Sequence, residues 1–253
     1  MERSKFGIEG LDTALNGGIP AGNLVVVSGG AGTGKSTLCM QFLINGCQQF
    51  HEKGLYLSTE QKLDELKRQA EQYGWPLQDL IDQGSLKVVH INIVKGEDFF
   101  KSVEAALVDF KPTRAVVDSL NTLSDYAAVT DYARQLYLER GVHSQAMKEH
   151  LIPVETTEKM MSRRMTAALV NTLRGFGATT LLTSELPEKG EYLSSDGISE
   201  FLCDGVLSLH YLGVGLSQFR SLQIRKMRYS SHSNDIFGYD FSSTGIIFVK
   251  DAV

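Results

Sequence analysis

The sequence predicts an α/β fold with a mainly parallel sheet, helices on both of its faces and antiparallel strands at its C-terminal end. Short apolar runs rich in β-branched residues alternate with helical patterns up to about residue 204, which is typical of a parallel sheet covered by helices. Beyond that point strand patterns follow one another directly, as they do in hairpins. With 253 residues, 42% of them hydrophobic, the chain can bury a core of this kind.

The predicted elements follow from local patterns. Leu63, Leu66, Ala70 and Tyr73 recur at helical spacing, and Gly74 ends that helix. A second helical pattern stops before Pro112. Five apolar runs are the predicted parallel strands: residues 23–29, 54–59, 86–93, 114–120 and 178–185. Four runs near the C-terminus are predicted to extend the sheet with antiparallel strands: residues 205–212, 219–228, 236–241 and 245–249.

No linker, repeat or low-complexity tract divides the sequence, so we predict a single domain over residues 1–253. Its unusual part is an inserted helical arm around residues 125–164, which lengthens the crossover between the fourth and fifth strands. In the second helix of this region, Thr156 or Thr157 is the expected cap and Gly175 the expected end. The arm is a candidate surface for a protein partner.

Composition limits the compartment and the partners. Cys39, Cys47 and Cys203 are too few and too scattered for a disulfide framework or a zinc cluster. The first ten residues do not form a signal peptide, and no apolar run approaches the roughly 18–20 residues that cross a bilayer. We therefore expect a cytoplasmic protein without membrane contact. The net charge of −5 argues against general coating of nucleic acid but leaves local basic stretches.

A glycine-rich loop is the strongest functional signal. Gly29, four residues and then Gly34-Lys35-Ser36 match the P-loop pattern directly after an apolar strand. Glycines let backbone N–H groups turn inward around phosphate oxygens, and the helix that starts near Lys35 adds its positive end. Lys35 can reach the β- and γ-phosphates, and the Ser36 hydroxyl can bind Mg²⁺. The predicted phosphate-binding residues are Gly30, Ala31, Gly32, Thr33, Gly34, Lys35, Ser36 and Thr37.

Three residues at strand ends complete the predicted chemistry. Asp118 is placed to hold the water shell of Mg²⁺, together with Ser36. Glu60 follows the second strand, which the expected order puts one sheet position from the P-loop, and is the predicted general base for water. Ser184, at the end of the fifth strand, is the predicted sensor of the γ-phosphate.

The order and spacing of these motifs resemble a known family. The stretch "FGIEGLDTALNGGIPAGNLVVVSGGAGTGKST" looks like the opening of the KaiC branch of RecA-like ATPases. The resemblance continues through "TEQKLDELKRQAEQYGW", "RAVVDSL", "ATTLLTSE", "GISEFLCDGVLSLHY" and "KMRYSSHS". It covers nearly the whole chain outside the arm, and it implies a RecA-like P-loop NTPase core.

The resemblance also implies an assembly: a ring, usually a hexamer, with ATP between adjacent subunits. The choice of ATP over GTP rests on this likeness. In such proteins the lysine and arginine of a K-x-R motif lean onto the neighbouring subunit's nucleotide; here they are Lys226 and Arg228, which would assist catalysis. The further positions that the resemblance assigns to the nucleotide are Met227, Ser230, His232, Ser242 and Ser243.

Two departures from the family pattern limit these implications. Where KaiC proteins commonly carry two adjacent glutamates after the second strand, this chain reads Glu60-Gln61, so the hydrolysis rate is in question. Where the clock protein's second domain carries a phosphorylated Ser-Thr pair, this chain reads Glu200-Phe201. Protein autokinase activity is therefore not supported.

The predicted function is Mg²⁺-dependent ATP binding and hydrolysis by a homo-oligomeric ring that couples the ATP state to conformation or partner binding. One alternative is a DNA-dependent ATPase or recombinase of the RecA/RadA type, in which Arg163 and Arg164 would contact phosphates in the central channel. Nucleic acid is the less favoured partner, since solvated helix charges explain these arginines as well. The other alternative is a non-catalytic scaffold whose subunits are clamped by ATP.

Overall fold

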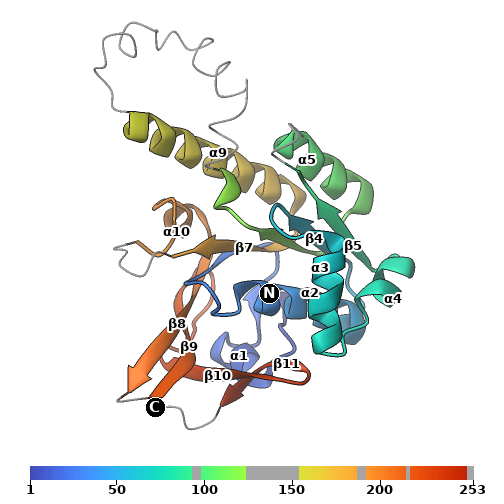
Figure 1. Ribbon diagram of the computed structural model, residues 1–253, viewed down its shortest axis with the longest axis vertical. Helices are drawn as coiled ribbons and strands as arrows, with labels where there is room; N and C mark the ends of the chain where they lie inside the picture. The colour runs from blue at the N-terminus through green and yellow to red at the C-terminus, as the bar shows by residue number, and fades with distance from the viewer. Residues whose placement is uncertain (93–97, 124–153, 187–191, 215–216, 250–253) are drawn as a thin grey trace, which may run out of the picture.

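The computed structural model describes residues 1–92, 98–123, 154–186, 192–214 and 217–249. Most of the predicted arm, residues 124–153, lies outside these ranges. The described chain contains a nine-stranded sheet in the order β11-β10-β9-β8-β3-β7-β6-β4-β5 (Figure 1). Its strands are β3 (Leu24–Gly29), β4 (Gly54–Ser58), β5 (Leu86–His90), β6 (Arg114–Asp118), β7 (Thr179–Glu185), β8 (Gly205–Val214), β9 (Ser217–Met227), β10 (Ile236–Ser242) and β11 (Gly245–Val249).

The parallel part of the sheet is larger than the sequence indicates. The five predicted parallel strands are confirmed, and β8 also pairs in parallel with β3, so that Val25 lies opposite Gly205. The antiparallel extension therefore begins at the β8–β9 pairing and continues through β10 and β11. After β7, a crossover places β8 in parallel beside β3 before the hairpins begin. Local strand patterns do not show with which strand β8 will pair.

Helices cover both faces of the sheet, as predicted. Successive residues of β3 point to opposite faces: Val25 and Val27 belong to one core cluster, and Leu24 and Val26 to the other. Figure 1 shows α5 and α9 together on one side of the sheet and α2 on the other. The helices are α1 (Glu9–Ala14), α2 (Lys35–Phe50), α3 (Leu63–Gln72), α4 (Leu77–Asp82), α5 (Phe99–Phe110), α9 (Val154–Phe176) and α10 (Ser199–Leu202).

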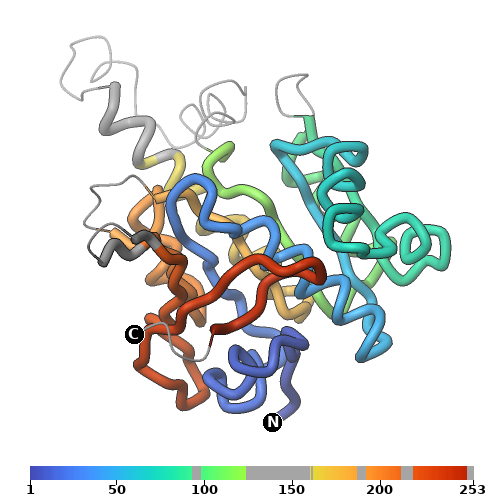
Figure 2. Tube along the Cα trace, turned by 60° about the horizontal axis from the view of Figure 1, so that its bottom comes forward, coloured from blue at the N-terminus to red at the C-terminus, as the bar shows by residue number. Residues whose placement is uncertain are grey.

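The N-terminal segment joins the C-terminal strands. Short strands β1 (Arg3–Ser4) and β2 (Ile19–Pro20) pair with each other and flank α1. An added Cβ at Gly10 of α1 would lie 2.5 Å from the Phe248 ring of β11, so only glycine allows this close packing. Figure 2 shows the dark blue N-terminal segment next to the red C-terminal strands.

Three sequence-based expectations need correction. The strand before Glu60 is β4, and β7 and β6 lie between it and β3, so the expected position one strand from the P-loop is wrong. Helix α9 already includes residue 154 and runs through Gly175 to Phe176, so Thr156 and Thr157 lie inside it rather than at its cap. The helix ends where Gly177 adopts the left-handed conformation (φ 71°).

Helix α4 is not among the elements predicted from the sequence. Pro76 precedes it directly, and a proline that stops one helix also fits the start of the next. Within the described ranges, no helix is both long and apolar enough to span a membrane.

Candidate functional site

The P-loop follows β3 and leads into α2, as the sequence predicts. Gly32 and Gly34 have φ angles of 73° and 92°, a region that side chains rarely adopt. A Cβ at Gly34 would also lie 2.6 Å from the Phe241 ring of β10. These two positions therefore require glycine, and the backbone turns at the point where α2 presents its first N–H groups.

Lys35 lies folded over this loop. Its ammonium group donates to the carbonyls of Gly29 (3.0 Å) and Gly30 (2.9 Å). Burial lowers the pKa of Lys35, while the charges of Glu185 and Asp118 act in the opposite direction. A half-buried ammonium group beside inward-turned amides provides a strong site for an anion.

Tyrosines from neighbouring strands hold the loop from outside. The Tyr211 hydroxyl of β8 donates to the Gly32 carbonyl (2.7 Å), and the Tyr239 hydroxyl of β10 donates to the Thr33 carbonyl. Within the loop, the Thr33 hydroxyl donates to the Gly30 carbonyl (2.8 Å). These hydrogen bonds restrain the backbone of the loop. Neither tyrosine is predicted from the sequence to contact the loop.

The predicted metal ligands are close to one another. Asp118 is 5% exposed, and its carboxylate accepts hydrogen bonds from the Tyr56 and Thr183 hydroxyls, both 2.5 Å long. Burial and the charge of Asp118 raise the pKa of Tyr56 well above its usual value, whereas a hydrogen bond with the Ser36 side chain acts in the opposite direction. Tyr56 thus links Asp118 to Ser36.

This donor set suits Mg²⁺ rather than a metal held by protein alone. One carboxylate and one hydroxyl are hard oxygen donors, and Mg²⁺ usually combines one or two carboxylates with water and substrate phosphates. Among the described residues, no group of three or more His, Cys, Asp or Glu side chains could hold a metal ion. A magnesium ion here would therefore depend on bound phosphate for its other ligands.

Glu60 and Gln61, which follow β4 after Thr59, are oriented differently. Glu60 is exposed, and its carboxylate accepts a hydrogen bond from the Ser119 hydroxyl. Gln61 borders the pocket beside the P-loop, and its buried side-chain oxygen has no hydrogen-bond partner. The neutral residue of the pair, rather than the predicted base, is the one that lines this pocket.

A pocket of about 660 Å³ continues from the P-loop towards α3. The Gln69 side chain donates to the Thr37 hydroxyl (3.0 Å), and its own buried oxygen has no partner. Aromatic rings of Tyr73 and Phe241 form part of the wall, with centroids 6.4 Å apart. The lining residues are Gly32, Gly34, Lys35, Ser36, Thr37, Gln61, Glu65, Arg68, Gln69, Gln72, Tyr73 and Phe241.

Several predicted residues lie elsewhere. Ser184 is fully buried and hydrogen-bonds to Ser195, and it is not part of the pocket wall. Ser242 stabilises the β10–β11 turn by donating to the Gly245 carbonyl (2.9 Å), and Ser243 is exposed in that turn. Arg163, predicted as a candidate DNA contact, donates to the Asp196 carbonyl (3.3 Å).

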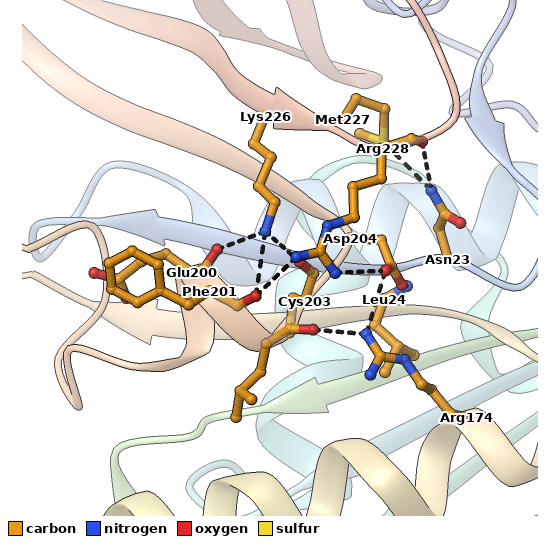
Figure 3. A network of polar contacts seen from close by, with 11 residues as sticks. Asn23, Leu24, Arg174, Glu200, Phe201, Cys203, Asp204, Lys226, Met227 and Arg228 are labelled. Atoms are coloured by element: carbon orange, nitrogen blue, oxygen red, sulfur yellow. Dashed lines mark hydrogen bonds and ion pairs between the residues drawn. The ribbon is translucent and has the colours of Figure 1, made fainter.

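Lys226 and Arg228 form a second basic site with α10. Figure 3 shows both side chains, together with Arg174 of α9, converging on the end of α10 and on Asp204. Lys226 donates to the carbonyls of Glu200, Phe201 and Cys203, at 2.8, 3.4 and 2.6 Å. Arg228 donates to the Phe201 carbonyl (3.2 Å) and pairs with Asp204 (3.5 Å).

This second site lies at the opposite end of β3 from the P-loop. The Leu24 amide donates to the Asp204 carboxylate (3.1 Å), and the Asn23 side chain donates to the Arg228 carbonyl (3.2 Å). The P-loop begins after Gly29, at the carboxyl end of the same strand. Six residues of strand span about 20 Å, at about 3.3 Å per residue. Lys226 and Arg228 therefore cannot touch a phosphate bound at their own P-loop.

The other residues predicted around the second site differ in exposure. Met227 is only 6% exposed and packs against Gly205, so its side chain belongs to the core. Ser230 and His232 remain at least partly exposed in the loop after β9, where each hydrogen-bonds to a carbonyl of the next residue. Ser230 and His232 thus keep a surface position for the predicted nucleotide contact, whereas Met227 does not.

Comparison with known proteins agrees with the geometry. A family model described as "ATPase: KaiC" matches residues 4–141 and 149–253. The UPF0273 protein MJ1359 of Methanocaldococcus jannaschii is 29% identical over 253 residues, covering 100% of this chain and 98% of that protein. The KaiC-like protein PH0186 of Pyrococcus horikoshii has a similar structure, with a TM-score of 0.78, 27% identity and coverage of 98% of this chain and 99% of that one.

The circadian clock oscillator protein KaiC of Synechococcus elongatus is also similar. It is 29% identical over 250 residues, which cover 94% of this chain but 42% of the clock protein. The chain therefore spans less than half of that relative's length.

Proposed function

This chain belongs to the KaiC family of ATPases, and on that premise we propose that it binds ATP with Mg²⁺ and hydrolyses it in a ring of identical subunits. The family assignment supports nucleotide binding at the P-loop. The ring, the metal and the hydrolysis are the further parts of the proposal. In the ring, the ATP state would be coupled to conformation or to the binding of a partner.

Within one subunit, the P-loop amides and Lys35 would hold the β- and γ-phosphates. Ser36 and Asp118 would hold Mg²⁺, whose role is to neutralise charge on the phosphates. Tyr56 and Thr183 keep the Asp118 carboxylate in one orientation through their 2.5 Å hydrogen bonds. The pocket beside α3 has room for the base and the ribose, with the aromatic edges of Tyr73 and Phe241 on its wall.

One distance within a subunit supports the proposal that the site is shared between subunits. It is the distance between the P-loop and the basic pair Lys226 and Arg228. Lys226 and Arg228 lie at the amino end of β3, about 20 Å from the P-loop at its carboxyl end. If Lys226 and Arg228 serve a γ-phosphate in addition to Lys35, that phosphate must therefore be bound to another copy of the chain. Charge that develops on the transferred phosphoryl group is stabilised by such a cation supplied in trans, which makes hydrolysis depend on assembly.

Hydrolysis also needs a group that orients water. Glu60 is the predicted base, and its carboxylate would have to leave its hydrogen bond with Ser119 to activate water. Gln61 already borders the pocket and could orient water through its amide, without taking a proton. Both residues follow β4, so either would act in the subunit that binds the ATP.

A scaffold that ATP clamps but does not consume is the second candidate function. It is favoured by one observation, namely that the neutral Gln61 lines the pocket while Glu60 is hydrogen-bonded to Ser119. In that case nucleotide would set the assembly without turnover.

The test combines native mass with a phosphate-release assay, each with and without Mg-ATP. We expect a ring that forms or tightens with ATP and releases phosphate, and no effect of ATP on a Lys35→Ala variant. An exposed lysine on α5, which does not line the pocket, provides the control, Lys101→Ala. ATP-dependent assembly without phosphate release would favour the scaffold, and a monomer under all conditions would contradict both functions.

A further inference from the structure

A second cavity, of about 840 Å³, lies between α1, α2 and the β10–β11 hairpin, where the N-terminal segment meets the C-terminal strands (Figure 2). We call it the α1 cavity. Its volume is within the range of about 300–1,000 Å³ that is usual for small-molecule sites. Within the described ranges it shares no lining residue with the pocket beside the P-loop. The α1 cavity is therefore separate from the space that the proposed function assigns to ATP.

Two stacked aromatic rings form an apolar wall of the α1 cavity. The rings of Phe237 (β10) and Phe248 (β11) have centroids 5.4 Å apart and planes at 6° to each other. Both residues are only partly buried. Ile8, Ala14 and Ile246 line the same cavity and are buried. A flat or aliphatic ligand body would remove this apolar surface from water.

The charged residues of this cavity are acidic. Among the described lining residues are Glu9 and Asp235, and none of them is a lysine or an arginine. Both acidic residues are exposed, and neither carboxylate forms an ion pair with another described residue. The pocket beside the P-loop, in contrast, is lined by Lys35 and Arg68. The α1 cavity therefore disfavours phosphates and attracts a cation.

The aromatic rings add to the preference for a cation. An ammonium or guanidinium group is attracted to the face of an aromatic ring. Several rings elsewhere in the described chain already have a lysine or an arginine over them. No described lysine or arginine lies over Phe237 or Phe248. These two rings can therefore serve a cation that comes from a ligand.

Asn45 of α2 offers a hydrogen-bond acceptor on the same wall. This residue is 8% exposed, and its side-chain amide donates to the carbonyls of Phe6 (2.8 Å) and Gly7 (3.4 Å). Its side-chain oxygen accepts no hydrogen bond from the residues that the structure describes. A ligand that displaces water from the cavity would have to satisfy this oxygen, and an N–H group of the ligand would do so.

We propose that the α1 cavity is a ligand site distinct from the nucleotide site, and that it binds a small molecule with a protonated amine on a flat apolar body. The apolar body would lie against Phe237 and Phe248. The acidic residues would attract the ammonium group, and an N–H group of the ligand would donate to Asn45. Nucleotides and other anions would be disfavoured by the charge of the wall.

The first test compares two probes that share a ring but differ in charge. Tryptamine carries an ammonium group on an indole ring, and indole-3-acetate carries a carboxylate on the same ring. At low ionic strength we expect tryptamine to bind with a Kd on the order of 1 mM, at least about five-fold tighter than indole-3-acetate. Titration followed by saturation-transfer NMR measures both. Equal affinities, or no binding of tryptamine at about ten times that concentration, would overturn the proposal.

The second test removes the charge of the wall. The double variant Glu9→Gln/Asp235→Asn should weaken tryptamine binding about five-fold, and the difference from the wild type should shrink as salt is added. The affinity for indole-3-acetate should not fall. The matched control is Glu104→Gln, which neutralises an exposed acid on α5 away from the cavity. Tryptamine binding that is unchanged in the double variant, or equally weakened in the control, would contradict the proposal.

The third test locates the ligand. Thr13 is exposed on α1 and lines the cavity, so Thr13→Phe should fill it and weaken tryptamine binding at least about ten-fold. Lys101→Phe, on the exposed surface of α5, should bind tryptamine as the wild type does. If Thr13→Phe does not fold, Thr13→Lys is the second variant, since it adds a positive charge to the wall.

Saturating Mg-ATP should leave tryptamine binding unchanged, because the two cavities are separate. Displacement of tryptamine by ATP, or wild-type binding in the folded Thr13 variant, would place the ligand elsewhere and would overturn the proposal. A chain that binds no ATP would refute the proposed function, whereas the Thr13 and charge variants would still decide whether the α1 cavity binds an amine.

Discussion

The Asn23 side chain donates a 3.2 Å hydrogen bond to the Arg228 carbonyl, which anchors the second basic site one residue before β3 begins. The P-loop starts where that strand ends. The distance between the two sites is therefore set by a buried strand rather than by mobile side chains. In the proposed ring, each end of the strand would supply half of a nucleotide site, and a neighbouring copy would complete it.

Mixed assemblies should recover activity that each variant alone lacks. Arg228→Ala should slow ATP turnover on the order of 10³-fold, as loss of a cation supplied in trans does in related chemistry. Asp118→Asn should disable the subunit that binds the nucleotide. In a random equal mixture, roughly a quarter of the sites combine an intact Asp118 with an intact Arg228 from the neighbour.

Turnover in the mixture should therefore rise to about a quarter of the wild-type rate, measured by phosphate release after the two variants exchange subunits. A mixture that stays as slow as the two separate variants would show that the sites are not shared. The control is the same mixture made with Arg225→Ala, which alters an exposed arginine on β9 without touching α10.

Asp118→Asn should separate nucleotide binding from its dependence on Mg²⁺. The P-loop amides and Lys35 remain, so ATP should bind in EDTA with nearly wild-type affinity. Loss of the carboxylate removes the charge that holds the metal, so added Mg²⁺ should no longer tighten binding. Titration calorimetry with and without Mg²⁺ measures the difference. Equal tightening by Mg²⁺ in both proteins would exclude Asp118 as a metal-site residue.

Substitutions of Glu60 and of Gln61 should change ATP turnover to different extents. If Glu60 is the general base, Glu60→Gln should lower turnover about 10²-fold or more, and Gln61→Ala should have a smaller effect. If Gln61 orients the water, Gln61→Ala should be the slower variant and Glu60→Gln should be nearly silent. Steady-state phosphate release at saturating ATP distinguishes the two patterns. No change in either variant would remove both residues from the chemistry.

Asp196 should make the fold sensitive to acid. Burial acts to raise the pKa of Asp196, but hydrogen bonds from the Ser199 and Ser194 hydroxyls and from the Ser199 and Ile198 amides outweigh it, so the folded pKa is lowered. A lowered carboxyl pKa contributes stability above the unfolded value of about 3.9, and this is lost as pH falls through the folded pKa.

The difference in unfolding free energy between the wild type and Asp196→Asn should thus be largest near neutral pH and shrink below about pH 4. Urea denaturation across this pH range measures it. A difference that is constant with pH would show that the charge of Asp196 does not contribute. Thr166→Val, which removes one neutral partner of the same carboxylate, should lower stability without abolishing the pH dependence.

Much of the fold was predictable because its signals are local. The apolar run that forms β3 and the glycine-rich turn after it depend on residues that are adjacent in sequence, and the structure has both. The order of the strands was not, because crossovers decide which strands become neighbours. That is why Glu60 was expected beside the P-loop strand, although β7 and β6 intervene.

The parts of the site that were missed depend on contacts between distant residues. Tyr211 and Tyr239 bind P-loop carbonyls that lie 179 and 206 residues away in the sequence. Likewise, the sequence does not show that the Met227 side chain is buried, because that depends on its packing against Gly205. In each case the sequence identified the strand but could not show what its side chains would meet.

In the proposed ring, each end of β3 would supply one half of a nucleotide site, and this has a consequence for symmetry. A two-fold pair could also join such halves, because each chain would then lend its arginine to the other. A ring instead needs head-to-tail contacts, in which the P-loop end of one chain meets the second basic site of the next, and such contacts either close or grow into a filament. The proposed ring would therefore have a polarity, in which every copy receives an arginine from one side and lends its own to the other.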